Sequence, residues 1–194
     1  MLKRFLSVKF IRRLERGEET GYRVAVVGAG PAGLAAAGEL ACRGHEVHVY
    51  DRLPEPGGML MFVIPDFRFP KDAVRRAIRE LEGLGVEFKV RVDVSSLTLF
   101  RELIAKYDAL IVATGAWSSR RLGIRGEEAR GVYCALEWVH RHMMHKLGYA
   151  APPEPPGERV AVVGAGLTAA DVCEILVREY GAKPLLIYRL SLIH

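Results

Sequence analysis

One eight-residue segment, Arg-Val-Ala-Val-Val-Gly-Ala-Gly, occurs twice in this chain of 194 residues, starting at Arg23 and again at Arg159. Each copy contains a short β-branched run and a glycine turn, and an alanine-rich stretch that favours a helix follows. A repeat of this kind indicates two copies of one strand–turn–helix unit. Because strands that alternate with helices build parallel sheets, the expected fold class is α/β.

Hydrophobic periodicity and turn residues place the expected elements. Around the first copy we expect strands at residues 23–27, 46–51, 86–91 and 109–113, and helices at residues 31–43, 71–84 and 97–106. Around the second copy we expect a strand at 159–163, a helix at 168–180 and a strand at 184–188. Residues 53–70, rich in proline and glycine, are expected to form a loop. The stiff proline-rich connector at 151–157 predicts a boundary, so the expected domains are residues 1–20, 21–150 and 151–194.

The first glycine turn has the spacing of a dinucleotide-binding loop. Gly28, Gly30 and Gly33 follow an apolar strand and open a helix, the context in which this motif is specific. Gly28 permits the tight turn, Gly30 lets a pyrophosphate approach the backbone, and Gly33 lets helix and strand pack closely. Asp51 ends the next strand, 18 positions after Gly33, where a carboxylate accepts hydrogen bonds from a ribose. The motif therefore predicts a Rossmann-like domain that binds FAD or NAD.

Three further segments carry a family signature. They are Asp51-Arg-Leu-Pro-Glu-Pro-Gly-Gly-Met-Leu, Val63-Ile-Pro-Asp-Phe-Arg-Phe-Pro-Lys71 and Tyr107-Asp-Ala-Leu-Ile-Val-Ala-Thr-Gly115. Together they resemble the family of the glutamate synthase small subunit, which includes the related flavin domain of dihydropyrimidine dehydrogenase. The resemblance runs from about Glu19 to Arg189. It implies a flavoprotein of the two-dinucleotide type, with FAD in one domain and NAD(P)H in a second.

The resemblance also implies roles for residues at matching positions. It places the FAD pyrophosphate on Gly28, Ala29, Gly30, Pro31 and Ala32, and the adenosine ribose on Asp51. Further contacts with FAD are expected from Arg52, Gly58, Met59, Arg68, Val94, Thr114 and Gly115. Asp66 and Lys71, in the most specific segment, are expected to be solvated or to cap a helix.

The second glycine turn is expected to hold the nicotinamide cofactor. Its predicted contacts are Ala165, Gly166, Leu167 and Thr168. Ala169 stands where the first motif has its third glycine, and Leu167 stands where members of the family favour a polar residue. The following strand ends in Tyr188 and Arg189, without a carboxylate. An arginine there can clamp a 2′-phosphate through a bidentate contact, which favours NADPH over NADH.

Cysteine content and hydropathy exclude several other classes of protein. The three cysteines, Cys42, Cys134 and Cys173, form no CxxC pair and no metal-ligand spacing, which disfavours a redox dithiol, a zinc site and an iron–sulfur cluster. This usage fits a reducing, cytoplasmic setting. No apolar stretch reaches the roughly 20 residues that a membrane helix needs, so no membrane span is expected.

The net charge of +5 is concentrated near the start of the chain. Basic residues there flank an apolar helical face, which predicts an amphipathic helix over residues 1–20 that docks on its own domain or on a partner. Binding to nucleic acid or to an anionic membrane surface, and a mitochondrial presequence, are the alternatives for this segment. For the protein as a whole we expect no nucleic-acid ligand.

The expected function is that of a flavoprotein oxidoreductase, an enzyme that passes hydride from NADPH or NADH to FAD and electrons onward to a partner or acceptor. No side chain need act as acid, base or nucleophile, and no metal site is expected. The alternative is a non-catalytic FAD-binding module or an incomplete part of a larger reductase. The second unit has two predicted strands where a nucleotide-binding half-sheet has three or more. Another subunit or a second copy of the chain is therefore expected to complete the fold.

Overall fold

The computed structural model describes residues 15–189. Contacts divide this part of the chain into unit 1, residues 15–61 and 66–115, and unit 2, residues 62–65 and 116–189. The domain boundary predicted at residue 151 stays a prediction. Most of the amphipathic helix predicted over residues 1–20 lies outside the described residues, and residues 15–22 form neither helix nor strand.

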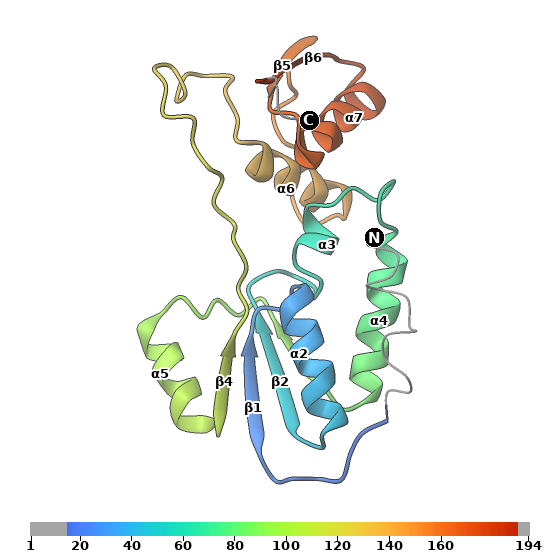
Figure 1. The fold of residues 1–194 in the computed structure, drawn as a ribbon, viewed down its shortest axis with the longest axis vertical. Coiled ribbons are helices and arrows are strands. Elements are labelled where there is room, and N and C mark those ends of the chain that lie inside the picture. Colours follow the sequence, from blue (N-terminus) through green and yellow to red (C-terminus); the bar gives the residue numbers. More distant parts are fainter. Residues whose placement is uncertain (1–14, 190–194) are drawn as a thin grey trace. The chain divides into compact units, whose positions relative to one another are not determined.

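Unit 1 is built on a parallel sheet (Figure 1). Its strands are β1 (Arg23–Val27), β2 (Glu46–Asp51), β3 (Glu87–Val90) and β4 (Ala109–Val112), and they lie in the order β3-β2-β1-β4. Each neighbouring pair is parallel, with Val27 opposite Tyr50 on one side and Val112 on the other. The α/β fold class and the Rossmann-like order of strands are therefore confirmed. Because parallel strands end at the same edge, the loops after β1, β2 and β4 come together there.

Helices cover both faces of this sheet. Helices α2 (Pro31–Cys42) and α4 (Lys71–Gly83) share a core with one face of β1 and β2, built around Val26, Val47 and Val49. Helix α5 (Leu97–Lys106) packs on the other face, through Leu103 against Ala25 and Val27. The alternation of side chains along β1 explains how one short strand serves two cores.

The predicted loop at residues 53–70 contains a helix that the pattern did not reveal. Helix α3 (Met59–Phe62) forms a single turn directly after Gly57 and Gly58. Both glycines have positive φ angles, 128° and 52°, so the chain reverses sharply before the helix starts. The other elements predicted between residues 23 and 188 occur, and each of their ends lies within one residue of the prediction. Shifts of this size are common at the ends of helices and strands.

Unit 2 contains α6 (Ala135–Lys146), β5 (Arg159–Val163), α7 (Leu167–Tyr180) and β6 (Lys183–Ile187). Within the described residues, β5 and β6 form a parallel sheet of two strands, with Ala161 opposite Leu185 and Val163 opposite Ile187. Because side chains alternate along a strand, these four residues share one face, which we call the open face. All four are exposed, so this face of the sheet is bare in unit 2.

Candidate functional site

The first glycine turn holds the ends of three strands of unit 1 together. Gly28 donates its backbone N–H to the carbonyl of Tyr50 at 2.7 Å and has a φ angle of 108°. A Cβ atom at this position would lie 2.3 Å from the carbonyl oxygen of Ala113. Only glycine therefore allows β1 to turn here while the end of β4 stays in contact. This contact brings the backbone of Thr114, a predicted FAD residue, beside the loop.

The start of α2 is shaped to receive an anion. A Cβ atom at Gly33 would lie 1.8 Å from the carbonyl oxygen of Gly28, so the helix approaches the strand more closely than any other residue permits. A Cβ atom at Gly30 would meet no described atom within 4 Å, so this side of the loop is open. Among the described residues, no side chain caps the helix and none in its first turn is acidic. Its free N–H groups and the positive end of its dipole are therefore available to a phosphate.

The turn formed by Gly57 and Gly58 lies against the loop at Gly28 and Gly30, and we call the backbone surface of Gly28, Gly30 and Gly58 the cradle. Gly57 donates its backbone N–H to the carbonyl of Ala29 at 2.9 Å. A Cβ atom at Gly58 would lie 2.7 Å from Cα of Gly30, so the two turns are in backbone contact. Gly30 and Gly58 therefore form one continuous backbone surface, and the contact of Gly58 with FAD stays a prediction.

Asp51 ends β2 beside the cradle and is buried, with 9% of its surface exposed. One carboxylate oxygen accepts the N–H of Ala29 at 2.6 Å, and the other accepts the N–H of Leu53 at 2.8 Å. Each oxygen has a further lone pair, so the carboxylate can still accept hydrogen bonds from ribose hydroxyls. Asp51 therefore has a structural role in shaping the loop that sequence reasoning did not assign to it.

The remaining residues predicted to contact FAD differ in how far they are exposed. Arg52, Arg68, Thr114 and Gly115 are exposed, and Met59 is partly buried at the start of α3. Val94 is also partly buried and packs on the core that α5 shares with the sheet, beside Tyr50 and Leu103. The contacts of these residues with FAD stay predictions.

Sequence reasoning missed a buried polar network on the α5 side of β2. The hydroxyl of Tyr107 lies 2.5 Å from Nδ1 of His48 and 2.7 Å from the hydroxyl of Tyr50. The backbone carbonyl of Tyr50 accepts the hydrogen bond from the N–H of Gly28. Burial lowers the pKa of His48, although Glu87 beside its ring raises it in part. Burial and the hydrogen bond with Tyr50 raise the pKa of Tyr107. Both rings are therefore neutral near pH 7 and link the glycine turn to the α5–β4 junction.

The second glycine turn repeats the backbone geometry of the first. Gly164 donates to the carbonyl of Ile187 at 2.8 Å, as Gly28 does to Tyr50. This equivalence places Tyr188 where unit 1 has Asp51, which confirms that no carboxylate ends this strand. A Cβ atom at Gly164 would lie 3.9 Å from that of Ala169, so the wider spacing of strand and helix accommodates alanine there. Among the described residues, no side chain caps α7.

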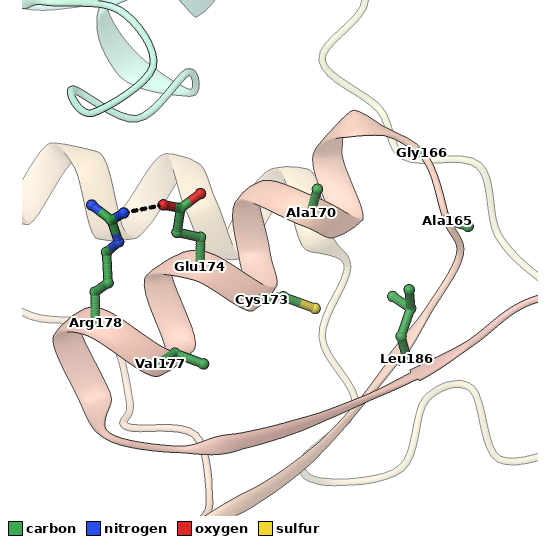
Figure 2. A pocket seen from close by; sticks show the side chains of 8 residues that line it. All are labelled: Ala165, Gly166, Ala170, Cys173, Glu174, Val177, Arg178 and Leu186. Atoms are coloured by element: carbon green, nitrogen blue, oxygen red, sulfur yellow. Dashed lines mark ion pairs between the residues drawn. The ribbon is translucent and has the colours of Figure 1, made fainter.

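A hollow of about 450 Å³ opens beside this turn, between α7 and β6 (Figure 2). Glu174 and Arg178 form an ion pair at its rim, and Leu186 points into it from β6. The residues that line it are Ala165, Gly166, Ala170, Cys173, Glu174, Val177, Arg178 and Leu186. The predicted contacts Leu167, Thr168 and Arg189 are exposed. Their roles also stay predictions.

Between residues 15 and 189, no group of three His, Cys, Asp or Glu side chains is placed to hold a metal ion. None of the helices described has both the length and the apolar character required to span a bilayer. The cysteines Cys42, Cys134 and Cys173 are all free.

Comparison with known proteins places this chain in a family. The family described as pyridine nucleotide-disulphide oxidoreductase matches residues 22–194. The chain is 39% identical over 171 residues to the glutamate synthase (NADPH) small chain of Escherichia coli K12, covering 86% of this chain and 36% of that protein. It is 38% identical over 180 residues to the NADP(+)-dependent formate dehydrogenase subunit beta of Moorella thermoacetica, covering 90% of this chain and 25% of that protein.

A solved structure agrees with these relatives. Mycobacterium tuberculosis FprA in complex with NADPH is 31% identical and has a TM-score of 0.69, covering 80% of this chain and 36% of that one. The chain therefore spans about a third or less of the length of these proteins. The resemblance to the glutamate synthase small subunit family is confirmed. The chain belongs to the pyridine nucleotide-disulphide oxidoreductase family.

Proposed function

We propose that this chain forms the FAD site and part of the NADPH site of a flavoprotein oxidoreductase. The observation that carries the proposal is the cradle of Gly28, Gly30 and Gly58, where a bare backbone surface meets the uncapped start of α2. Asp51 lies beside it at the place suited to the adenosine ribose. This set of groups fits the diphosphate and ribose of a dinucleotide. The printed names of the relatives include NADPH and NADP(+), which supports the same proposal.

In this proposal the chain binds and orients its cofactors. FAD, when bound, accepts hydride from a reduced nicotinamide and releases electrons to an acceptor. The N–H groups at the start of α2 hold the pyrophosphate, and the carboxylate of Asp51 holds the ribose and the N–H of Ala29 together. Neither role requires a side chain that donates or removes a proton, so no acid, base or nucleophile is assigned.

The nicotinamide site favours NADPH. Tyr188 directly follows β6, at a position where a carboxylate would repel a 2′-phosphate, and the exposed Arg189 comes next. We expect Arg189→Ala to weaken NADPH binding by about 1–3 kcal/mol, the contribution of a charged hydrogen bond, and to leave NADH binding almost unchanged. Titration calorimetry with both cofactors, with Lys183→Ala as the control, measures this. Equal losses for NADPH and NADH would remove the assignment.

We further propose that another subunit or a second copy of the chain covers the open face of unit 2. Two relatives are named as a small chain and as a subunit, so each belongs to a larger assembly. The acceptor of the electrons is another protein centre or a small molecule reached through that assembly. Three free cysteines support a reducing, cytoplasmic setting.

A second candidate function is a FAD-binding module without turnover. The second glycine turn supports it, because Leu167 stands where members of the family favour a polar residue. Such a module would bind FAD through unit 1 and would not be reduced by NADPH.

One experiment separates the two candidates. The purified chain, loaded with FAD, is titrated with NADPH without oxygen while its visible absorption is recorded. We expect the flavin bands to bleach. Bands that persist, when dithionite still bleaches them, would favour the module without turnover. Absence of FAD binding would contradict both functions.

A further inference from the structure

Helix α4 contacts both sides of the turn formed by Gly57 and Gly58. Lys71, at the first position of the helix, donates a hydrogen bond from Nζ to the carbonyl of Leu60 at 2.7 Å, just after the turn. Arg75, one helical turn later, donates from Nε and one terminal nitrogen to the two carboxylate oxygens of Glu55, both at 3.0 Å, just before the turn. We call these two contacts the α4 clamp.

Lys71 occupies a position that is energetically unfavourable for a cation. Its side chain is buried, with 7% of the residue exposed, although the sequence predicted a solvated or capping residue. Burying a cation costs free energy, and a cation at the start of a helix faces the positive end of the dipole. The carbonyl of Leu60, in the single turn of α3, accepts a hydrogen bond from this buried cation. This hydrogen bond offsets part of the cost of burying the ammonium group.

The ion pair of Arg75 and Glu55 has the forked geometry that holds both groups in one orientation. The side chain of Glu55 is 16% exposed, so the pair is less screened than one at the surface. Since Lys71 and Arg75 are four residues apart, they lie on one face of α4. One rigid helix therefore determines where residues 55 to 60 lie.

The turn held in this way is the second half of the cradle. A Cβ atom at Gly58 would lie 2.7 Å from Cα of Gly30, and Gly57 donates its N–H to the carbonyl of Ala29. We propose that Lys71 and Arg75 are positioning residues for FAD, which hold the Gly57–Gly58 turn against the pyrophosphate loop. This inference rests on the proposed FAD site and adds residues that do not themselves contact the cofactor.

The test compares Lys71→Met and Arg75→Met with Arg79→Met, which removes the same charge from an exposed position of the same helix. We expect each clamp variant to raise the Kd for FAD roughly tenfold, as loss of a charged hydrogen bond does, and the control to change it less than about twofold. The Kd for NADPH is expected to stay unchanged in all three. An equal loss of both cofactors would indicate general destabilisation and would overturn the proposal.

Hydrogen exchange of the protein without FAD provides a readout independent of the cofactor. The amides of Leu60 and Met61 donate to the carbonyls of Gly57 and Gly58 and report directly on the turn. We expect Lys71→Met to accelerate their exchange several-fold. Exchange equal to that of Arg79→Met, or faster exchange with an unchanged Kd for FAD, would contradict the clamp.

The ion pair of Arg75 and Glu55 provides a second test if Lys71→Met does not fold, because this pair is partly exposed. In a double-mutant cycle, Glu55→Gln is expected to weaken FAD binding in the wild-type background and to have no further effect in Arg75→Met. Additive losses would overturn the role of this pair. If the wild-type chain binds no FAD, the proposed function fails, while exchange at Leu60 still tests the clamp. If it binds FAD and all variants equal Arg79→Met, the clamp alone fails.

Discussion

At the residue scale, the glycines of the first motif serve different purposes. Gly28 and Gly33 are required by the protein itself, because a Cβ atom at either would overlap a backbone oxygen. Gly30 is different, since its φ angle of −76° suits any residue and a Cβ atom there would meet nothing within 4 Å. Packing within the described residues therefore does not require glycine at this position, and the proposed pyrophosphate contact would.

This difference predicts that folding and binding can be separated. We expect Gly30→Ala to lower the free energy of unfolding by less than about 1 kcal/mol, the scale of a changed N-cap, and to weaken FAD binding roughly tenfold or more. We expect Gly28→Ala to lower the free energy of unfolding by about 1–3 kcal/mol, because it combines a strained φ angle with a clash. Urea unfolding and FAD titration of both variants measure this. Full FAD affinity in Gly30→Ala would remove the pyrophosphate assignment.

Asp51 combines a structural and a binding role in one carboxylate. Asp51→Ala is expected to weaken FAD binding, to leave NADPH binding nearly unchanged, and to lower the free energy of unfolding by about 1–3 kcal/mol, because the N–H groups of Ala29 and Leu53 lose their acceptors. Asp51→Asn, which keeps one acceptor oxygen, separates the two effects when melting and FAD titration are compared. If Asp51→Asn binds FAD as the wild type does, the ribose assignment is wrong.

At the scale of elements, polar contacts buried between helices and strands hold each unit together. In unit 1, His48 of β2 meets Tyr107 after α5. In unit 2, His142 of α6 meets Tyr180 of α7, with Nδ1 3.0 Å from the hydroxyl, and its ring stacks on Trp138. Burial lowers the pKa of both histidines, which the neighbouring carboxylates Glu87 and Glu179 offset only in part. Both contacts therefore favour the neutral form of the histidine side chain.

The lowered pKa of His48 gives a pH dependence with a definite sign. Its folded pKa lies below the usual 6.5, so the unfolded chain takes up the proton first as the pH falls. The contribution of His48 to the free energy of unfolding is therefore expected to be fully present above about pH 6.5 and to decrease below it. Urea unfolding at about pH 7.5 and about pH 5.5 should show a smaller decrease in His48→Gln than in the wild type. An unchanged or larger decrease would contradict a neutral His48 in the folded state.

At the scale of the whole molecule, the two units bury their sheets to different extents. The sheet of unit 1 has helices on both faces, whereas Leu185 and Ile187 on the open face of unit 2 are 61% and 47% exposed. Parallel sheets are normally covered on both faces. An exposed apolar face of this kind is typical of an interaction surface.

This face predicts association of the chain with itself when no other partner is present. We expect sedimentation velocity to show a dimer or larger species whose share rises with concentration, and Leu185→Lys to shift it towards the monomer. Leu97→Lys in α5 is a matched control, because Leu97 is also a 61% exposed leucine. FAD binding by unit 1 should be the same in both variants. A wild-type chain that stays monomeric at all concentrations would exclude self-association.

The sequence alone determined the local framework of this protein. The repeated Arg-Val-Ala-Val-Val-Gly-Ala-Gly segment forms the same strand and turn in both units, and Gly28 and Gly164 make equivalent hydrogen bonds. These features depend on φ angles, on side-chain alternation and on neighbours close in the sequence, so a pattern is enough to predict them. The same holds for the place of Asp51 at the end of β2.

Only the tertiary structure decided what surrounds these local elements. Val27 and Val163 occupy the same position of the repeat, yet Val27 is 8% exposed and Val163 is 59% exposed. The core around Leu103 of α5 covers Val27, whereas no described element of unit 2 covers the open face on which Val163 lies. The burial of Lys71 and its bond to Leu60 were likewise absent from any local pattern. Burial and charge pairing depend on residues distant in the sequence, and these contacts are set only when the whole chain has packed.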